Sequence, residues 1–131
     1  MNCIIILLLS FLSPAGKSLP TENETLDAEE HSNATLTWIH FAKTTTDRLH
    51  INLRIMELEK SIYQYDSRSR PEPYINDQFR GRLLCDLQLD GEGQLLCVLT
   101  DLRLNDTGWY QLFINGECHK KKYQLTVRGK Q

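Results

Sequence analysis

The stretch Asp106-Thr107-Gly108-Trp109-Tyr110 is the most specific string in this sequence, and a predicted β-hairpin begins inside it. Residues 109–114 and 117–127 have the composition of strands and flank Asn115-Gly116. Asn-Gly is a strong hairpin signal, because both residues tolerate the positive φ angles of a tight turn. The C-terminal part of the chain is therefore predicted to be two antiparallel strands.

The strand pattern continues upstream of this hairpin. Residues 82–89 and 94–99 flank the glycine-rich turn Asp90-Gly91-Glu92-Gly93 and predict a second hairpin. Alternation of apolar and polar residues predicts further strands at 34–38 and 51–55.

Between these strands the pattern is less regular. An aromatic-rich run at 62–65 is consistent with another strand, and Arg70-Pro71-Glu72-Pro73 then breaks regular structure. Residues 51–60 are open to a second interpretation, because the Met56-Glu57-Leu58-Glu59-Lys60 end favours helix. Several short strands separated by turns predict an all-β fold, a two-sheet antiparallel sandwich.

Asp106, Gly108 and Tyr110 match the Asp-x-Gly-x-Tyr signature of immunoglobulin V-type domains. The chain resembles that family over residues 33–128, and the resemblance implies a Greek-key sandwich. It also implies that Tyr110 buries its ring and bonds through its hydroxyl to the upstream backbone, as a tyrosine corner. The family pairs the Asp with an Arg at the start of the fourth strand, strand D. Arg80 or Arg82 fits that role, and Arg80 is assigned to the motif.

The chain departs from the family at its cysteines. The positions of the usual inter-sheet Cys pair are predicted to hold Trp38 and Leu112, and that of the core Trp is predicted to hold Leu53. The inter-sheet disulfide is therefore predicted to be missing, a loss of about 4 to 5 kcal/mol by loop entropy. Apolar side chains in the same volume recover part of this through burial.

The remaining cysteines suggest a different bridge. Cys85 and Cys97 lie on the two strands of one hairpin, at positions that stand opposite each other. A disulfide there closes a short loop and is worth about 3 kcal/mol at most; the alternative is two free, buried thiols. Cys118 is then left over, because Cys3 departs with the signal peptide. An odd Cys in a secreted chain indicates an intermolecular bridge, and hence a homodimer, or a reactive thiol.

The N-terminus has the layout of a secretory signal peptide, assigned to residues 1–18: an apolar run followed by small residues. A buried strand or a short anchor helix is the alternative. Residues 19–32 are acidic and are predicted to be a loosely ordered lead-in. Residues 33–128 form the predicted domain, and residues 129–131 form a C-terminal tail.

Asn-x-Thr sequons begin at Asn23, Asn33 and Asn105 and fit a secreted glycoprotein. Because the chain ends directly after the last predicted strand, a truncated form of a longer cell-surface receptor is the alternative to a secreted product.

The sheet that contains the C-terminal hairpin commonly carries the partner site in V-type domains. Strand parity gives its predicted outward residues: Arg54, Met56, Gln111, Phe113, Lys120 and Lys122. Tyr63 and Tyr65 compete for the contribution of the strand beside Arg54. Apolar side chains ringed by basic ones suit an acidic protein partner; the alternatives are a solvated lysine edge and a Phe113 covered by a loop.

Other function classes find little support in the sequence. The four histidines are scattered without metal-ligand spacing, and no nucleophile or phosphate-binding motif occurs. We therefore expect no enzyme activity, no metal and no cofactor. A formal net charge of −2 argues against nucleic acid.

The expected partner is a cell-surface protein, such as another immunoglobulin-type domain. The stretch from Arg80 to Tyr110 looks like butyrophilin-type costimulatory ligands. The hairpin around Asn115-Gly116, which runs into a Lys-rich strand, resembles the signalling lymphocyte activation molecule group, which we favour. Both imply immune-cell recognition, adhesion or co-signalling. A soluble decoy or secreted immune regulator and a purely structural role are the alternatives.

Overall fold

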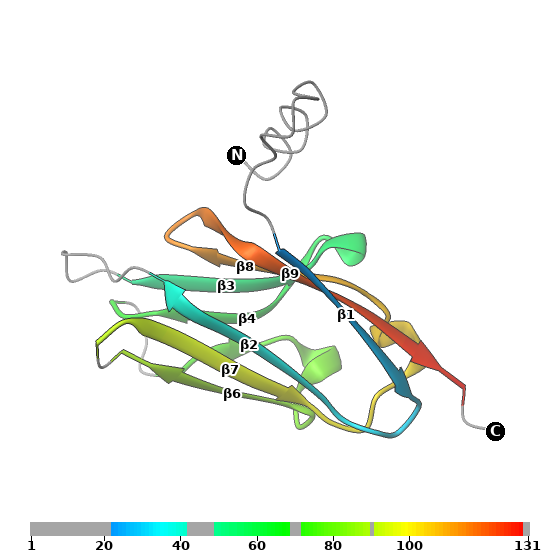
Figure 1. Ribbon diagram of the computed structural model, residues 1–131. Helices are drawn as coiled ribbons and strands as arrows, with labels where there is room; N and C mark the ends of the chain where they lie inside the picture. Colours follow the sequence, from blue (N-terminus) through cyan, green and yellow to red (C-terminus); the bar gives the residue numbers. More distant parts are fainter. Residues whose placement is uncertain (1–21, 42–48, 69–71, 90, 130–131) are drawn as a thin grey trace, which may run out of the picture.

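The computed structural model describes residues 22–41, 49–68, 72–89 and 91–129, so the predicted signal peptide (1–18) lies outside the described residues. Two sheets pack face to face (Figure 1): six strands in the order β1-β9-β8-β3-β4-β5 and three in the order β2-β7-β6. The strands are β1 (Glu22–Glu29), β2 (Ala34–Phe41), β3 (His50–Ile55), β4 (Lys60–Asp66), β5 (Tyr74–Ile75), β6 (Leu83–Gln88), β7 (Gly93–Leu99), β8 (Gly108–Ile114) and β9 (Glu117–Arg128). Short 3-10 turns lie in the connections: η1 (Met56–Leu58), η2 (Asp77–Phe79) and η3 (Leu104–Asp106).

The predicted all-β sandwich and both predicted hairpins are confirmed. Residues 51–60, for which both strand and helix were considered, contain a strand followed by a short helical turn. The segment continues as strand β3 to Ile55 and then forms the 3-10 turn η1, before β4 begins at Lys60. Among the described residues no helix is long and apolar enough to cross a membrane.

The predicted loosely ordered lead-in at 19–32 is wrong for residues 22–29, which form the edge strand β1. β1 runs parallel to β9 along its whole length. Leu26 and Ala28 pack against the core from this strand, and the burial of their side chains favours its docking. Its glutamates, which suggested a solvated segment, discourage further strand pairing at the open edge of the sheet.

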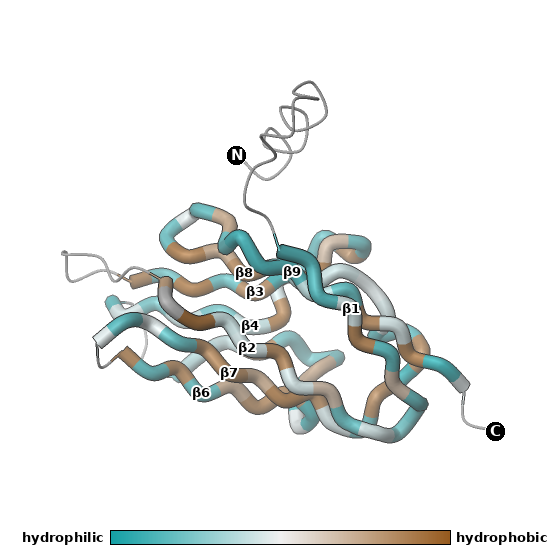
Figure 2. Tube along the Cα trace, viewed as in Figure 1, coloured by the Kyte–Doolittle hydropathy of each residue, from teal (hydrophilic) through white to brown (hydrophobic). Residues whose placement is uncertain are grey.

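The core lies between the two sheets and is built from alternate residues of each strand. Figure 2 shows apolar and polar segments following one another along the strands. In β7 every second residue from Gly93 to Leu99 is buried, and the residues between them are half-buried. Trp38, Phe79 and Tyr110 are among the largest side chains without exposed surface. Their burial supplies the main driving force for folding.

Trp38 on β2 and Leu112 on β8 were predicted to stand where the family has its inter-sheet cysteines. Both side chains are fully buried. Leu53 on β3 lies directly opposite Leu112. Apolar side chains thus fill the space between the sheets at the predicted positions.

A set of contacts joins the sheets between β2 and β9. The Trp38 ring packs edge-to-face on Tyr123, with centroids 5.1 Å apart, and its Nε1 donates to the Lys121 carbonyl at 2.9 Å. The Tyr123 hydroxyl accepts from the Thr37 N–H and donates to the Thr37 carbonyl, both at 3.0 Å. We call these four residues the Trp38–Tyr123 clasp. It satisfies backbone groups on the open edge of β2, which would otherwise lack protein partners.

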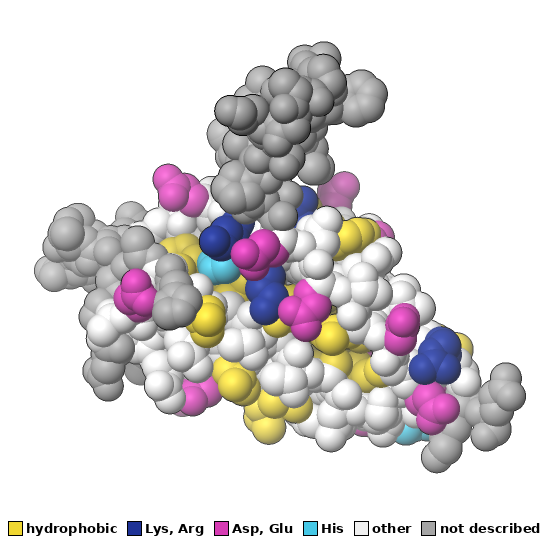
Figure 3. Space-filling view, viewed as in Figure 1, with side chains coloured by type: hydrophobic (Ala, Val, Ile, Leu, Met, Phe, Trp, Pro, Cys, Tyr) yellow, Lys and Arg dark blue, Asp and Glu magenta, His cyan; other side chains and the backbone are white. Residues whose placement is uncertain are grey.

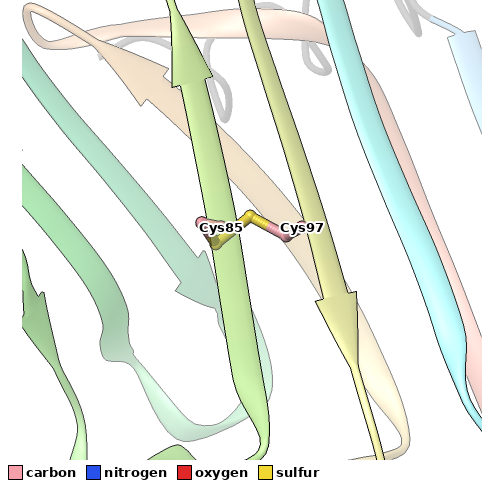
Figure 4. The surroundings of a disulfide bond; sticks show 2 residues. All are labelled: Cys85 and Cys97. Atoms are coloured by element: carbon pink, nitrogen blue, oxygen red, sulfur yellow. A yellow bond between two sulfur atoms is a disulfide. The ribbon is translucent and has the colours of Figure 1, made fainter.

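Cys85 on β6 and Cys97 on β7 stand directly opposite each other and form the predicted disulfide (Figure 4). Their Cα atoms lie 4.0 Å apart. The alternative of two free thiols is therefore wrong. The bridge joins neighbouring strands of the three-stranded sheet, so it closes a hairpin and does not connect the two sheets.

A buried ion pair anchors the turn before β8. The Arg82 guanidinium donates to both Asp106 carboxylate oxygens, at 2.8 and 3.0 Å, and both residues are buried. The same carboxylate accepts from the Arg103 N–H at 2.8 Å. The Tyr110 hydroxyl donates to the Asp106 carbonyl. The predicted tyrosine corner is therefore present.

The assignment of Arg80 to this motif is wrong. Arg80 is exposed just after η2 and pairs with Asp77 at 2.7 Å. Gly81, with a φ of +83°, turns the chain between the two arginines, so that Arg82 rather than Arg80 reaches Asp106.

Gly108 allows the start of β8 to approach η1 closely. A Cβ at this position would lie 2.7 Å from Glu57 Oε1 and 3.1 Å from the Ile55 side chain. The same Glu57 oxygen accepts from the Trp109 N–H at 2.8 Å. A larger residue at position 108 would therefore displace the Glu57 carboxylate from the Trp109 N–H and crowd Ile55.

We expect Arg82→Ala to lower the free energy of unfolding by about 3 to 5 kcal/mol, because it leaves the Asp106 carboxylate buried without a counter-charge. Urea unfolding measures this loss. Arg80→Ala is the matched control, and the loss of an exposed ion pair should change stability by no more than about 0.5 kcal/mol. Equal effects in the two variants would contradict the assignment of Arg82.

Tyr123→Phe keeps the ring against Trp38 and removes the hydroxyl that serves Thr37. We expect a loss of about 1 to 3 kcal/mol in thermal or urea unfolding, the cost of leaving partly buried polar groups unpaired. Tyr65→Phe is the control, since that half-buried hydroxyl has no hydrogen bond within the described residues. A loss no larger than that of the control would show that water replaces the hydroxyl.

Candidate functional site

The side chains that face away from the core form rows across the six-stranded sheet; we call this surface the outer face. One row, from β9 through β8 and β3 to β4, contains Lys122, Gln111, Arg54 and Ser61. The neighbouring row contains Cys118, Phe113, Asn52, Gln64 and Tyr74. Strand register, rather than proximity in the sequence, brings these side chains together.

The outer face brings together most of the predicted partner residues. Arg54, Phe113 and Lys122 are half-buried on it, and Met56 is half-buried in η1, just beyond the end of β3. Burial lowers the pKa of the Lys122 ammonium, because desolvation disfavours its charged form.

Gln111 corrects the prediction that it is an exposed contact. It lies in the predicted row but is only 4% exposed. β8 is a central strand, and the long side chains of Arg54 and Lys122 stand directly beside Gln111 on the two neighbouring strands. Long side chains can cover the surface between them. Gln111 therefore lies beneath Arg54 and Lys122 and is not available for direct contact with a partner.

Two lysines of β9 form ion pairs with glutamates of β1. Lys120 is exposed as predicted, but it pairs with Glu22 at 3.8 Å. Lys121 pairs with Glu24 at 3.2 Å. The predicted ring of free basic groups is therefore partly neutralised by β1, the strand that sequence reasoning missed.

A depression of about 560 Å³ opens on the outer face over β3, β4 and β5. Its lining is mostly polar and contains both charge signs: Arg54, Glu59, Lys60, Ser61, Gln64, Tyr74 and Asn76. Of these residues the sequence predicted only Arg54. The β5 residues pair with β4 for just two positions, too short a strand to leave a signal in the sequence.

Tyr63 and Tyr65, the predicted contributors from β4, do not reach the outer face. Tyr63 stands opposite the buried Leu53, and Tyr65 opposite the buried Ile51. The pairing of β3 with β4 shifts between Leu53 and Arg54. Gln64 faces outward in their place.

Two polar groups on this face lack partners in the described part of the protein. Arg54 makes no hydrogen bond or ion pair there, although it is half-buried. Asn52, two residues away on β3, has a buried Oδ1 atom without a hydrogen-bond partner. Buried polar groups are normally paired, so Asn52 Oδ1 suits a ligand that supplies a donor. The guanidinium nitrogens of Arg54 are not among the buried unpaired atoms of the described residues, and they can donate to an acceptor of the same ligand.

Comparison with solved structures gives the fold of this chain. No protein-family model and no curated protein sequence matches the chain. Among solved structures it is similar to the second Ig domain of the mouse polymeric immunoglobulin receptor, with a TM-score of 0.60 and 12% sequence identity. The match covers 84% of this chain and 100% of that one. The chain has the immunoglobulin fold.

In immunoglobulin terms, β9, β8 and β3 take the places of strands G, F and C, and the assignment to the variable type stays a prediction. β2, β7 and β6 take those of strands B, E and D. The resemblance to particular immune-receptor groups stays a prediction.

The predicted glycosylation sites are accessible in this immunoglobulin sandwich. Asn23, Asn33 and Asn105 are all exposed. Asn23 lies on β1 opposite Lys122, so a glycan there would border the outer face at its β9 end. Cys118 is half-buried opposite Phe113 and is not a free thiol, so the predicted alternative of a reactive thiol is wrong; a bridge to a second copy stays a prediction.

Two histidine side chains, those of His31 and His119, make hydrogen bonds within the fold. Throughout the described ranges no group of three or more His, Cys, Asp or Glu could bind a metal ion. His31 Nδ1 lies 2.8 Å from an Asp101 carboxylate oxygen, and this hydrogen bond lowers the pKa of Asp101.

His119 links β9 to the open edge of β2. Its Nδ1 accepts from the Lys121 N–H at 3.0 Å, so the ring proton sits on Nε2, which donates to the Ile39 carbonyl at 3.3 Å. Burial lowers the pKa of His119, and Lys120 and Lys121 act in the same direction. Protonation would place a second N–H against the Lys121 N–H, so this geometry requires the neutral ring.

Stability should therefore depend on pH through His119. Its pKa is about 6.5 in an unfolded chain and lower in the folded one, so the unfolded state binds more protons between the two values. The stabilisation is complete above the unfolded pKa and is lost as the pH falls through that interval. The contribution of Asp101 is lost only at more acidic pH, because carboxylates titrate there.

We expect the urea midpoint of the wild type to decrease when the pH is lowered from about 7.5 to about 5.5. The decrease should be smaller in His119→Gln. Arg128→Gln, at an exposed position at the far end of β9, is the control and should keep the wild-type pH dependence in this range. An unchanged pH dependence in His119→Gln would show that His119 does not titrate with folding.

Proposed function

We propose that this chain is an extracellular protein-binding domain that acts in immune-cell recognition, adhesion or co-signalling. The observation that carries the proposal is Arg54, a half-buried arginine on a central strand without a partner in the described residues. It lines the depression of about 560 Å³ on the outer face. Arginine is enriched among the residues that dominate binding energy at protein interfaces.

The chemistry of the outer face favours a protein partner with an acidic side chain at the contact. A carboxylate accepts two parallel hydrogen bonds from a guanidinium, which makes this the most specific pairing open to Arg54. Asn52 Oδ1 needs a donor, such as a backbone N–H of the partner. Phe113 is half-buried beside Asn52 and offers apolar contact area.

The breadth of the face also favours a protein over a small metabolite. The depression is open to solvent and lined mainly by polar groups, whereas small-molecule sites are enclosed and mostly apolar. The partner that fits this description is a cell-surface protein, and another immunoglobulin-type domain is one candidate.

The test uses a multimer of the secreted chain to capture partners from a panel of cell-surface proteins. Arg54→Glu should weaken binding to the captured partner by about 30-fold or more, the loss expected for a hot-spot residue. Phe113→Ala should weaken it as well.

Arg128→Glu is the matched control, because Arg128 is exposed at the far end of β9 and should leave affinity unchanged. Each variant is first checked for wild-type thermal unfolding. Full affinity in a folded Arg54→Glu would place the binding site elsewhere, and capture of no surface protein would argue against the function.

A further inference from the structure

The surface of the three-stranded sheet that faces away from the core carries exposed apolar side chains. Leu84 on β6 is 66% exposed and Ile39 on β2 is 44% exposed. Leu96 and Val98, on β7 between them, are half-buried. We call these four residues the apolar surface. Figure 3 shows apolar side chains at the surface over β2, β7 and β6.

Leu84 and Val98 adjoin on the apolar surface, whereas Leu96 stands between Asp86 and Thr37 and Ile39 stands opposite Gln94. Leu84 stands opposite Val98, and Val98 stands opposite Thr35, so the three side chains form one row from β6 to β2. β6 is an edge strand. An uncovered apolar edge is a site for unwanted pairing and aggregation, and contiguous apolar patches on soluble proteins usually have a function.

The sequon at Asn33 lies at the end of this surface. Asn33 is exposed and directly precedes β2, whose first residue, Ala34, is buried. Extending the alternation of β2 by this one residue places Asn33 on the same side of the sheet as Thr35. Thr35 is both the third residue of the sequon and the β2 member of the row that contains Leu84 and Val98. Strand spacing and rise per residue place Leu84 about 12 Å from Asn33, a distance that a branched glycan can span.

We propose that an N-linked glycan on Asn33 lies across the apolar surface and covers it. Sugar rings have C–H faces that contact apolar side chains and hydroxyl edges that remain in water, and glycans solubilise the surfaces that carry them. The other exposed sequons lie elsewhere: Asn105 is in η3, and Asn23 is on β1 of the six-stranded sheet. The occupant of this surface is therefore a covalent group of the chain itself.

The experiment compares Asn33→Gln with Asn105→Gln, both secreted from a glycosylating cell line, after mass spectrometry has established which sequons are occupied. Asn33→Gln should bind several-fold more of a hydrophobic fluorescent dye and self-associate at lower concentration, whereas Asn105→Gln should behave as the wild type. Leu84→Lys combined with Asn33→Gln should restore the wild-type behaviour, because it places a charge in the row.

Three results would overturn the proposal: an unoccupied Asn33, equal dye binding in the two single variants, or self-association of Asn33→Gln that persists with Leu84→Lys. If Asn33→Gln is not secreted, glycans are removed enzymatically from the folded wild type and from folded Leu84→Lys. Removal should raise dye binding in the wild type only. An equal rise in both proteins would contradict the proposal.

Discussion

The structure depends on the clasp in which Trp38 and Tyr123 join β2 to β9. Without a disulfide at the predicted inter-sheet positions, the two sheets are held there by ring packing and directed hydrogen bonds. Each such bond is worth only about 0.5 to 1.5 kcal/mol net, so the clasp acts by fixing geometry. It sets the position of β9, and β9 in turn positions β1 on one side and β8 on the other.

The two sheets differ in the contacts that stabilise them and in the surface that they expose. The three-stranded sheet contains the Cys85–Cys97 bridge. Arg82 lies directly before β6 of this sheet, and its buried ion pair with Asp106 connects β6 to the turn before β8. The six-stranded sheet presents a polar outer face with unpaired groups such as Asn52 Oδ1. Unpaired polar groups cost stability. The buried core and the Arg82–Asp106 ion pair offset this cost. The outer face can therefore retain unpaired polar groups without loss of the fold.

The parts of this structure that the sequence predicted are those with a local cause. Two hairpins, the Cys85–Cys97 pair and the tyrosine corner at Tyr110 all follow from turn residues or short spacings. β1 was missed because its partner, β9, lies at the other end of the chain, and an acidic strand beside a basic one looks solvated when read alone. The choice between Arg80 and Arg82 depended on a turn at Gly81 that motif spacing does not encode.

The candidate site was predicted less completely for a related reason. Parity identified Arg54 and Phe113, but the pairing of β4 with β3 sets Tyr63 opposite the buried Leu53 and Gln64 opposite Asn52, so that Gln64 rather than Tyr63 lies on the outer face. The burial of Gln111 depends on its neighbours on both sides, which only the assembled sheet defines.

The position of the disulfide has a consequence for how the protein matures. A bridge between adjacent strands of one hairpin requires only local chain closure, and short loops close far faster than distant segments meet. Oxidation of Cys85 and Cys97 therefore does not have to wait for the two sheets to assemble. An inter-sheet bridge would couple oxidation to completion of the core; here the two events are separable, and the hairpin can enter later folding steps already cross-linked.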